Sequence, residues 1–261
     1  MKRLAVAAVA CLAGCGAAGL DLLVVAPHSD DEAIGCATVM RRAIAEGRRV
    51  GVVVLSAGDG FPAAAAALAG KDVEKLTPDD FMALAGRRER HTREAMAKLG
   101  VDDLLFLGYP DGGLMKMYRA TDETPYLQPH TRKTATYGGN SPYVRASLLD
   151  DLGRILRERR PKEIYVTGEA DTHADHQAAF FYVRDAARAV GYRDVLWTFV
   201  VHGRPPDAAP GRRVTLTDVE LRAKRSLLEG YQEGVSPVHD RLAETYARPE
   251  ELFWGAAVEG R

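Results

Sequence analysis

Two short segments of the chain carry the side chains that could do chemistry. The first directly follows the apolar run 22–25 and holds one imidazole and three carboxylates, on His28, Asp30, Asp31 and Glu32. The second, residues 172–176, holds two imidazoles and a further carboxylate. Two imidazoles and one carboxylate can bind one metal ion and leave a coordination position open, with another carboxylate and imidazole free for proton transfer. These residue types predict a zinc hydrolase.

The spacing within each segment suits a shared site. His28 and Asp31 are three residues apart where a strand should turn into a helix, so both side chains can point into the same space. His173 and His176 are also three residues apart, just before a predicted helix. The alternative for Asp30 or Asp31 is a helix N-cap, in which a carboxylate accepts from free N–H groups. One cap explains one carboxylate, but not an imidazole and two carboxylates together.

Strand-like and helix-like segments alternate along the chain and must position these residues. The predicted strands are 20–26, 50–55, 104–107, 164–167 and 195–201, and the predicted helices are 31–46, 81–99, 143–159, 176–190 and 219–229. Strands that are apolar throughout and separated by helices indicate a parallel sheet covered on both faces. We therefore predict a single-domain α/β fold with a Rossmann-like, mostly parallel sheet and helices on both faces.

A polar segment follows each predicted strand. These segments are His28–Asp31, 56–60, 109–113, 171–176 and His202–Gly203. In an open parallel sheet such positions share the carboxyl edge, where ligands bind. We therefore expect five segments that are far apart in the sequence to converge on one cleft.

Length and composition fit one globular domain and disfavour other classes of protein. The 261 residues are 46% hydrophobic and 27% charged, which suits a sizeable core. The formal net charge of -1 offers no basic footprint for nucleic acid, so we expect no nucleic-acid partner. Beyond the N-terminus no apolar run reaches the roughly 18 residues that indicate a membrane-spanning helix.

The N-terminus is typical of a bacterial lipoprotein signal, predicted here as residues 1–15. A positive start precedes the apolar stretch 4–12 and a four-residue box that ends in Cys15. Cleavage before Cys15 and lipidation of its thiol would place the domain, residues 20–261, in the bacterial cell envelope, attached to the membrane only through the lipid. An ordinary apolar N-terminus, or a misassigned start, would leave the protein cytoplasmic. Cys36 is expected to pack as a small apolar side chain.

The two polar segments resemble the motifs of a known family. Residues 27–32 and 173–176 are similar to those of the LmbE-like (PIG-L) family of zinc-dependent N-deacetylases. The similarity extends to the turn at 109–114, the helix exit at 99–101 and the late segment from Lys224 to Gln232. The resemblance thus covers most of the chain beyond the predicted signal.

The resemblance implies a role for each motif residue. His28, Asp31 and His176 would ligate zinc. Asp30 would be the general base that activates water, and His173 would polarise or protonate the tetrahedral intermediate.

Four further residues are candidates for a place in the substrate cleft. Asp111 matches a family position that contacts the sugar. Arg88 lies near the place of a substrate-binding arginine in the family, with two neighbours as alternatives, Arg87 and Arg90. His202 and His239 could reach the cleft, and a packing or surface role is the alternative for both.

The implied function is a zinc-dependent hydrolase that removes the N-acetyl group from an N-acetylglucosamine-type sugar or glycoside. An amidase that acts on a non-acetyl amide or glycan conjugate stays open, as does a non-catalytic carbohydrate-binding lipoprotein. Iron or cobalt could occupy the same ligands. The expected partner is a small sugar or glycan, and the sequence leaves a homo-oligomer open. No G-x-G-x-x-G turn follows the first strand, which disfavours a nucleotide-binding domain.

Overall fold

The structure is a computed structural model that describes residues 19–122, 124–235 and 241–258. Its strands are β1 (Leu22–Ala26), β2 (Val50–Ser56), β3 (Asp103–Tyr109), β4 (Glu163–Thr167), β5 (Leu196–Phe199), β6 (Arg212–Thr215) and β7 (Glu250–Ala256). Its α-helices are α1 (Asp31–Ala45), α2 (Pro62–Ala69), α3 (Pro78–Leu99), α4 (Leu114–Arg119), α5 (Arg145–Arg159), α6 (Ala174–Ala189), α7 (Asp218–Val235) and α8 (Leu242–Tyr246). The predicted lipoprotein signal with Cys15, and His239, lie outside the described residues.

One seven-stranded sheet, in the order β3-β2-β1-β4-β5-β7-β6, forms the centre of the molecule. The four neighbouring pairs from β3 to β5 are parallel, whereas β7 runs antiparallel to both β5 and β6. The predicted α/β fold with a mostly parallel sheet is therefore confirmed. The chain moves outward from β1 in one direction to β2 and β3 and in the other to β4 and β5, so the strand order switches between β1 and β4. Such a switch point is where open α/β sheets bind ligands.

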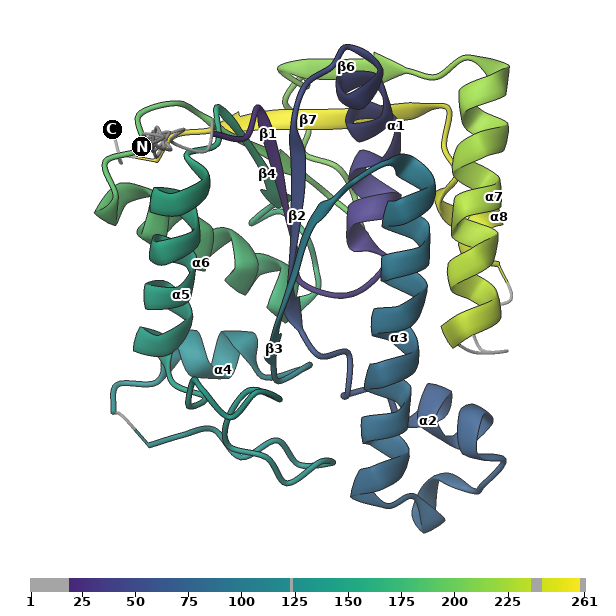
Figure 1. Ribbon diagram of the computed structural model, residues 1–261, viewed down its shortest axis with the longest axis vertical. Coiled ribbons are helices and arrows are strands. Elements are labelled where there is room, and N and C mark those ends of the chain that lie inside the picture. Colours follow the sequence, from purple (N-terminus) through teal and green to yellow (C-terminus); the bar gives the residue numbers. More distant parts are fainter. Residues whose placement is uncertain (1–18, 123, 236–240, 259–261) are drawn as a thin grey trace, which may run out of the picture.

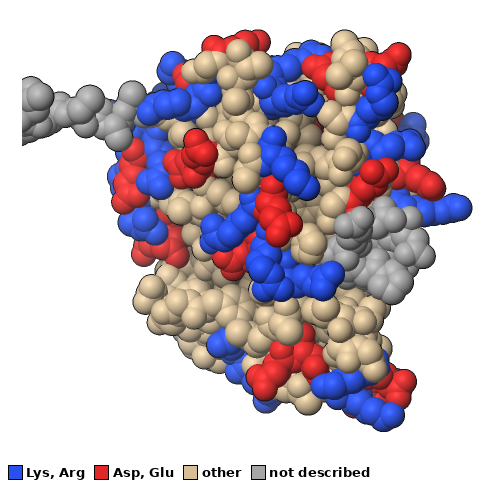
Figure 2. Space-filling model, turned by 45° about the vertical axis from the view of Figure 1, so that its right-hand side comes forward, with Lys and Arg blue, Asp and Glu red and all other residues tan. Residues whose placement is uncertain are grey.

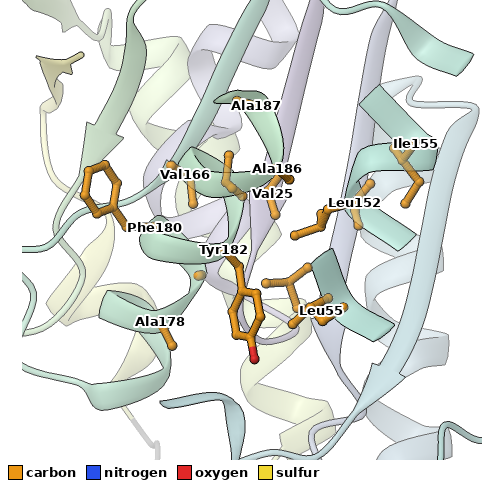
Figure 3. Packing of buried hydrophobic residues seen from close by; sticks show 14 of the residues in the cluster. Val25, Leu55, Leu152, Ile155, Val166, Ala178, Phe180, Tyr182, Ala186 and Ala187 are labelled. Atoms are coloured by element: carbon orange, nitrogen blue, oxygen red, sulfur yellow. The ribbon is translucent and has the colours of Figure 1, made fainter. Parts of the chain in front are cut away.

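Helices cover both faces of the sheet because alternate residues of its buried strands point to opposite sides (Figure 1). Leu23 and Val25 of β1 belong to a core cluster shared with α4, α5 and α6, which contains Leu152 and Tyr182 (Figure 3). Leu22 and the other alternate residues of β1 belong to a second cluster, shared with α1, α3 and α7. Full burial on both faces explains why these strands are apolar throughout.

Strands β6 and β7 and helices α4 and α8 are not among the elements predicted from the sequence. Strand β7 begins with two acids, a composition more typical of a surface than of a sheet interior. Glu251 is nevertheless buried, because its carboxylate lies 2.9 Å from the Lys224 ammonium and accepts from the backbone N–H groups of Thr38 and Val39. Partners on α7 and α1 thus offset the cost of burying this acid. Cys36 is a buried free thiol, as expected.

Charged side chains of both signs are mixed on the surface. Figure 2 shows basic and acidic residues side by side, in keeping with the formal net charge of -1. Within the described ranges, no helix is both long and apolar enough to cross a membrane.

Candidate metal centre

The carboxyl ends of the parallel strands surround one pocket of about 300 Å³. Each of the five polar segments contributes to its lining, through His28, Gly60, Asp111, His173 and His202. The predicted convergence on one cleft is therefore confirmed. Because β1 and β4 are neighbours in the sheet, the segments that follow them meet although His28 and His176 are 148 residues apart in the chain.

Three donor atoms form a triangle with equal sides, two of them on His28 and Asp31 of the pocket lining and one on the fully buried His176. Nδ1 of His28 lies 3.2 Å from Nε2 of His176 and 3.2 Å from Oδ2 of Asp31, and the last two atoms are also 3.2 Å apart. All three side chains are buried. A tetrahedral ion with bonds of about 2.0–2.1 Å needs ligand atoms about 3.3–3.4 Å apart. The arrangement of these three residues therefore fits one small divalent cation.

The second ring nitrogen of His28 faces two carboxylates. Nε2 lies 3.3 Å from Oδ1 of Asp111 and 3.4 Å from Oδ2 of Asp175. Burial opposes the charged imidazolium, but Asp111 and the other nearby carboxylates raise the pKa of His28 well above its usual value. In the neutral ring the same carboxylates favour a proton on Nε2, which leaves the lone pair on Nδ1, the atom that belongs to the triangle.

Asp30 stands at the start of α1 with an unusual backbone. Its φ of 111° lies in a region that residues other than glycine rarely adopt. Within residues 19–122, its side chain caps none of the free amide groups of α1, so a simple N-cap does not explain it. Burial, together with the Asp31 carboxylate, raises the pKa of Asp30 to about 7. A carboxylate with a pKa near neutrality suits general acid–base chemistry.

His173 forms the N-cap of α6. Its Nδ1 accepts a hydrogen bond of 3.2 Å from the backbone N–H of Asp175, so in the neutral ring the proton is on Nε2. The ring centroid lies 4.9 Å from that of His28 and 4.8 Å from that of His176. Burial, followed by these two imidazoles, lowers the pKa of His173, which keeps its ring neutral at pH 7.

Arg88 is the arginine of α3 that reaches the pocket. Its guanidinium donates to the backbone carbonyl of Ser29 at 3.1 Å and lies 3.8 Å from a carboxylate oxygen of Asp30. The same group lies 3.5 Å from Asp111, which also accepts from the backbone N–H of Gly60 at 3.2 Å. Of the described residues that line the pocket, Arg88 is the only arginine, which favours it over its two neighbours.

His202 also lies in the pocket, where its ring centroid is 4.9 Å from that of His176. The Tyr246 hydroxyl of α8 is 3.3 Å from its Nδ1. Tyr246 is not predicted as a pocket residue, because the short helix that carries it has no clear signal in the sequence.

Two buried acids without a predicted role, Asp59 and Asp171, contact residues of the site. Asp59 accepts hydrogen bonds from the backbone N–H of Asp111 at 3.0 Å, from the Tyr137 hydroxyl at 3.0 Å and from the Thr131 hydroxyl at 3.2 Å. These hydrogen bonds connect the long loop between α4 and α5, which carries Thr131 and Tyr137, to the turn that contains Asp111. Asp171, after β4, lies 3.1 Å from Nδ1 of His176. Both belong to polar segments that the sequence places at this edge, but neither has a motif signal of its own.

Comparison with known proteins identifies the family. The PIG-L family model, described as GlcNAc-PI de-N-acetylase, matches residues 23–187, more than half of the chain. A 1D-myo-inositol 2-acetamido-2-deoxy-alpha-D-glucopyranoside deacetylase from Streptomyces scabiei is 32% identical over 180 residues, which cover 66% of this chain and 49% of that protein. The protein of the same name from Streptomyces avermitilis is 40% identical over 172 residues, which cover 64% and 53%. The chain thus spans about half the length of these relatives.

Among solved structures, the N,N'-diacetylchitobiose deacetylase from Pyrococcus horikoshii has a similar fold. The TM-score is 0.62 at 18% sequence identity, and the match covers 91% of this chain and 84% of that one. At this identity the likeness concerns the fold alone. The family model and the sequence relatives together establish that the chain belongs to the PIG-L family.

Proposed function

We propose that the protein is a zinc-dependent hydrolase that removes the N-acetyl group from an N-acetylglucosamine-type sugar or glycoside. The observation that carries this proposal is the triangle of donor atoms on His28, Asp31 and His176, together with Asp30, which lines the same pocket as His28 and Asp31. Membership of the PIG-L family and relatives named as deacetylases of a 2-acetamido sugar support the substrate class. Hydrolysis would release acetate and a free amine.

Zinc is the cation that we propose for the triangle. Two imidazole nitrogens and one carboxylate oxygen are a donor set typical of catalytic zinc, with room left for water or substrate. When bound, zinc would supply a Lewis acid that polarises the amide carbonyl and activates water. Proton transfer and stabilisation of the reacting carbonyl oxygen would be carried out by side chains of the protein.

Asp30 is the proposed general base. Its carboxylate takes a proton from the attacking water as the oxygen bonds to the amide carbon, and it can later pass that proton to the departing nitrogen. The positive φ at Asp30 turns this residue away from the regular path of α1 and into the pocket. The guanidinium of Arg88, 3.8 Å away, holds the carboxylate in place.

His173 is the proposed hydrogen-bond donor to the reacting carbonyl oxygen. Its Nδ1 is already engaged by the backbone N–H of Asp175, so Nε2–H is the donor left for the substrate. As water adds and negative charge develops on the carbonyl oxygen, this donor stabilises the tetrahedral intermediate. When the intermediate collapses, the oxygen re-forms the carbonyl double bond and the C–N bond breaks, with the proton held by Asp30 passing to the nitrogen.

Asp111, Arg88 and His202 are proposed to bind the sugar. They line the pocket around the proposed reacting centre and present a carboxylate, a guanidinium and an imidazole, groups that can form hydrogen bonds with sugar hydroxyls.

We further propose that Cys15 anchors the protein to the cell envelope, a proposal supported by the signal-like N-terminal sequence. The substrate would then be an envelope or exogenous glycan.

The test is release of free amine from a panel of N-acetylglucosamine mono- and oligosaccharides by zinc-loaded protein. The matched control is Asp30→Asn, which keeps the shape of the side chain but removes the base. Amine released by the parent protein and lost in this variant, with zinc content unchanged, is the expected result. No release from any substrate while zinc stays bound would instead favour an amidase for another amide or a carbohydrate-binding protein.

A further inference from the structure

Asp171 is a fully enclosed carboxylate at the centre of the late histidine segment. It is 1% exposed and lies in the connection between β4 and α6. Oδ1 accepts from the backbone N–H of His173 at 2.9 Å. Oδ2 accepts from the backbone N–H groups of Val201 at 2.8 Å and His202 at 3.0 Å, and it lies 3.1 Å from Nδ1 of His176. One carboxylate thus contacts all three histidine positions on this side of the pocket.

These contacts fix which nitrogen of His176 carries the proton. Each Asp171 oxygen already accepts from backbone N–H groups, which can only donate, so this side chain serves as an acceptor. Nδ1 of His176 must therefore donate to it, which leaves the lone pair of the ring on Nε2. Nε2 is the atom that lies in the 3.2 Å triangle with His28 and Asp31.

The backbone of His176 is held without help from Asp171. The Thr167 hydroxyl donates to the His176 carbonyl at 2.9 Å, and the His176 N–H donates to the His173 carbonyl at 3.1 Å. Removing the Asp171 carboxylate would therefore leave both backbone hydrogen bonds of His176 in place while it releases the imidazole ring. The distinctive contribution of Asp171 to His176 is the orientation and tautomer of its ring.

We propose that Asp171 is a positioning residue that fixes the tautomer and orientation of the His176 ring for metal binding and holds the β5 exit that carries His202. The inference rests on the proposed function because it takes the triangle of donor atoms as a zinc site. Carboxylates behind metal-bound histidines commonly act in this way, and their loss costs about 10–100-fold in metal affinity or activity.

The experiment compares the full-length parent protein with Asp171→Asn and with a control, Asp151→Asn. Asp151 also accepts side-chain hydrogen bonds, from Tyr109 at 2.8 Å and Ser141 at 3.0 Å, but it does not line the pocket among the described residues. Zinc dissociation constants come from competition with a chelator, and kcat and KM come from amine release. We expect Asp171→Asn to weaken zinc binding about 10–100-fold and to lower kcat more than it raises KM, whereas Asp151→Asn keeps the parent zinc affinity.

A second measurement decides the question even where the asparagine variant does not fold. Nitrogen chemical shifts of the His176 ring in the zinc-loaded parent protein should show a protonated Nδ1 and a metal-bound Nε2. A proton on Nε2, or an Asp171→Asn variant with the zinc affinity of the parent, would overturn the proposal. Both readouts are independent of turnover, so failure to hydrolyse any sugar would count against the proposed function and leave this inference standing.

Discussion

The backbone N–H of Asp30 donates a hydrogen bond to the Glu32 carboxylate across 3.1 Å. The other oxygen of that carboxylate accepts from the hydroxyl of Tyr231, a residue of α7 that lies 199 positions further along the chain. Glu32 and Tyr231 are both buried. The turn that holds Asp30 at a positive φ, a conformation that costs about 1–3 kcal/mol, is therefore stabilised by α7, which packs with α1 on the same face of the sheet.

This relationship predicts that Glu32→Ala lowers both stability and turnover. Loss of the carboxylate leaves the Asp30 N–H and the Tyr231 hydroxyl without their partner, which costs about 1–3 kcal/mol for each buried group. Glu32→Gln is the matched control, because its amide can still accept from Asp30 and bond to Tyr231. Thermal melts and kcat should separate the two variants, and equal values for both would contradict the supporting role of Glu32.

The triangle of donor atoms predicts that ligands and base respond differently to substitution. His176→Ala or Asp31→Asn should abolish tight zinc binding, because each removes one of three donor atoms. Asp30→Asn should keep zinc and lower kcat by about 10²–10⁴-fold. Zinc content by elemental analysis, measured beside kcat, checks both statements. Loss of zinc from Asp30→Asn would identify Asp30 as a ligand instead of the base.

The pKa shifts predict how the stability of the chelated protein depends on pH. Burial raises the pKa of Glu32 to about 8. For His176, burial is outweighed by the carboxylates of Asp31 and Asp171, and its pKa rises to about 9. A group with a raised pKa in the folded state contributes its stabilisation at low pH and loses it as the pH rises through the folded value.

The melting temperature of the chelated protein should therefore fall between about pH 6.5 and 9. Metal binding requires deprotonated donors, so added zinc should restore more stability at pH 9 than at pH 6.5. Melting curves with and without zinc at a series of pH values test this. A melting temperature of the chelated protein that stays level or rises over this range would contradict the raised pKa values of Glu32 and His176.

The hydrogen bonds through which Asp59 connects the loop between α4 and α5 to the turn at Asp111 predict an effect on substrate binding. Tyr137→Phe removes one of the hydrogen bonds to Asp59, which orders the backbone N–H of Asp111. We expect KM to rise about five- to tenfold, equivalent to about 1 kcal/mol, with little change in kcat. Tyr192→Phe, which removes an exposed hydrogen bond to Lys162, is the control. Unchanged KM in Tyr137→Phe would show that the loop does not order Asp111.

The sequence by itself determined the fold class and the edge at which the site lies. Apolar strands such as β1 can only be buried on both faces, and polar segments after such strands meet at the carboxyl edge of a parallel sheet. His28 and Asp31 are close in the chain, so their proximity follows from local geometry. The pairing of His28 with His176 required the additional expectation that β1 and β4 share one sheet.

Only the tertiary structure decided which buried groups support these residues. The contacts of Glu32 with Tyr231, of Asp59 with Tyr137 and of His202 with Tyr246 span 199, 78 and 44 positions. A buried acid or tyrosine has no periodicity that identifies its partner, because its partner is chosen by how separate elements pack. Strand β7 shows the same limit, since Glu251 is compatible with a sheet interior only once Lys224 and the N–H groups of α1 lie beside it.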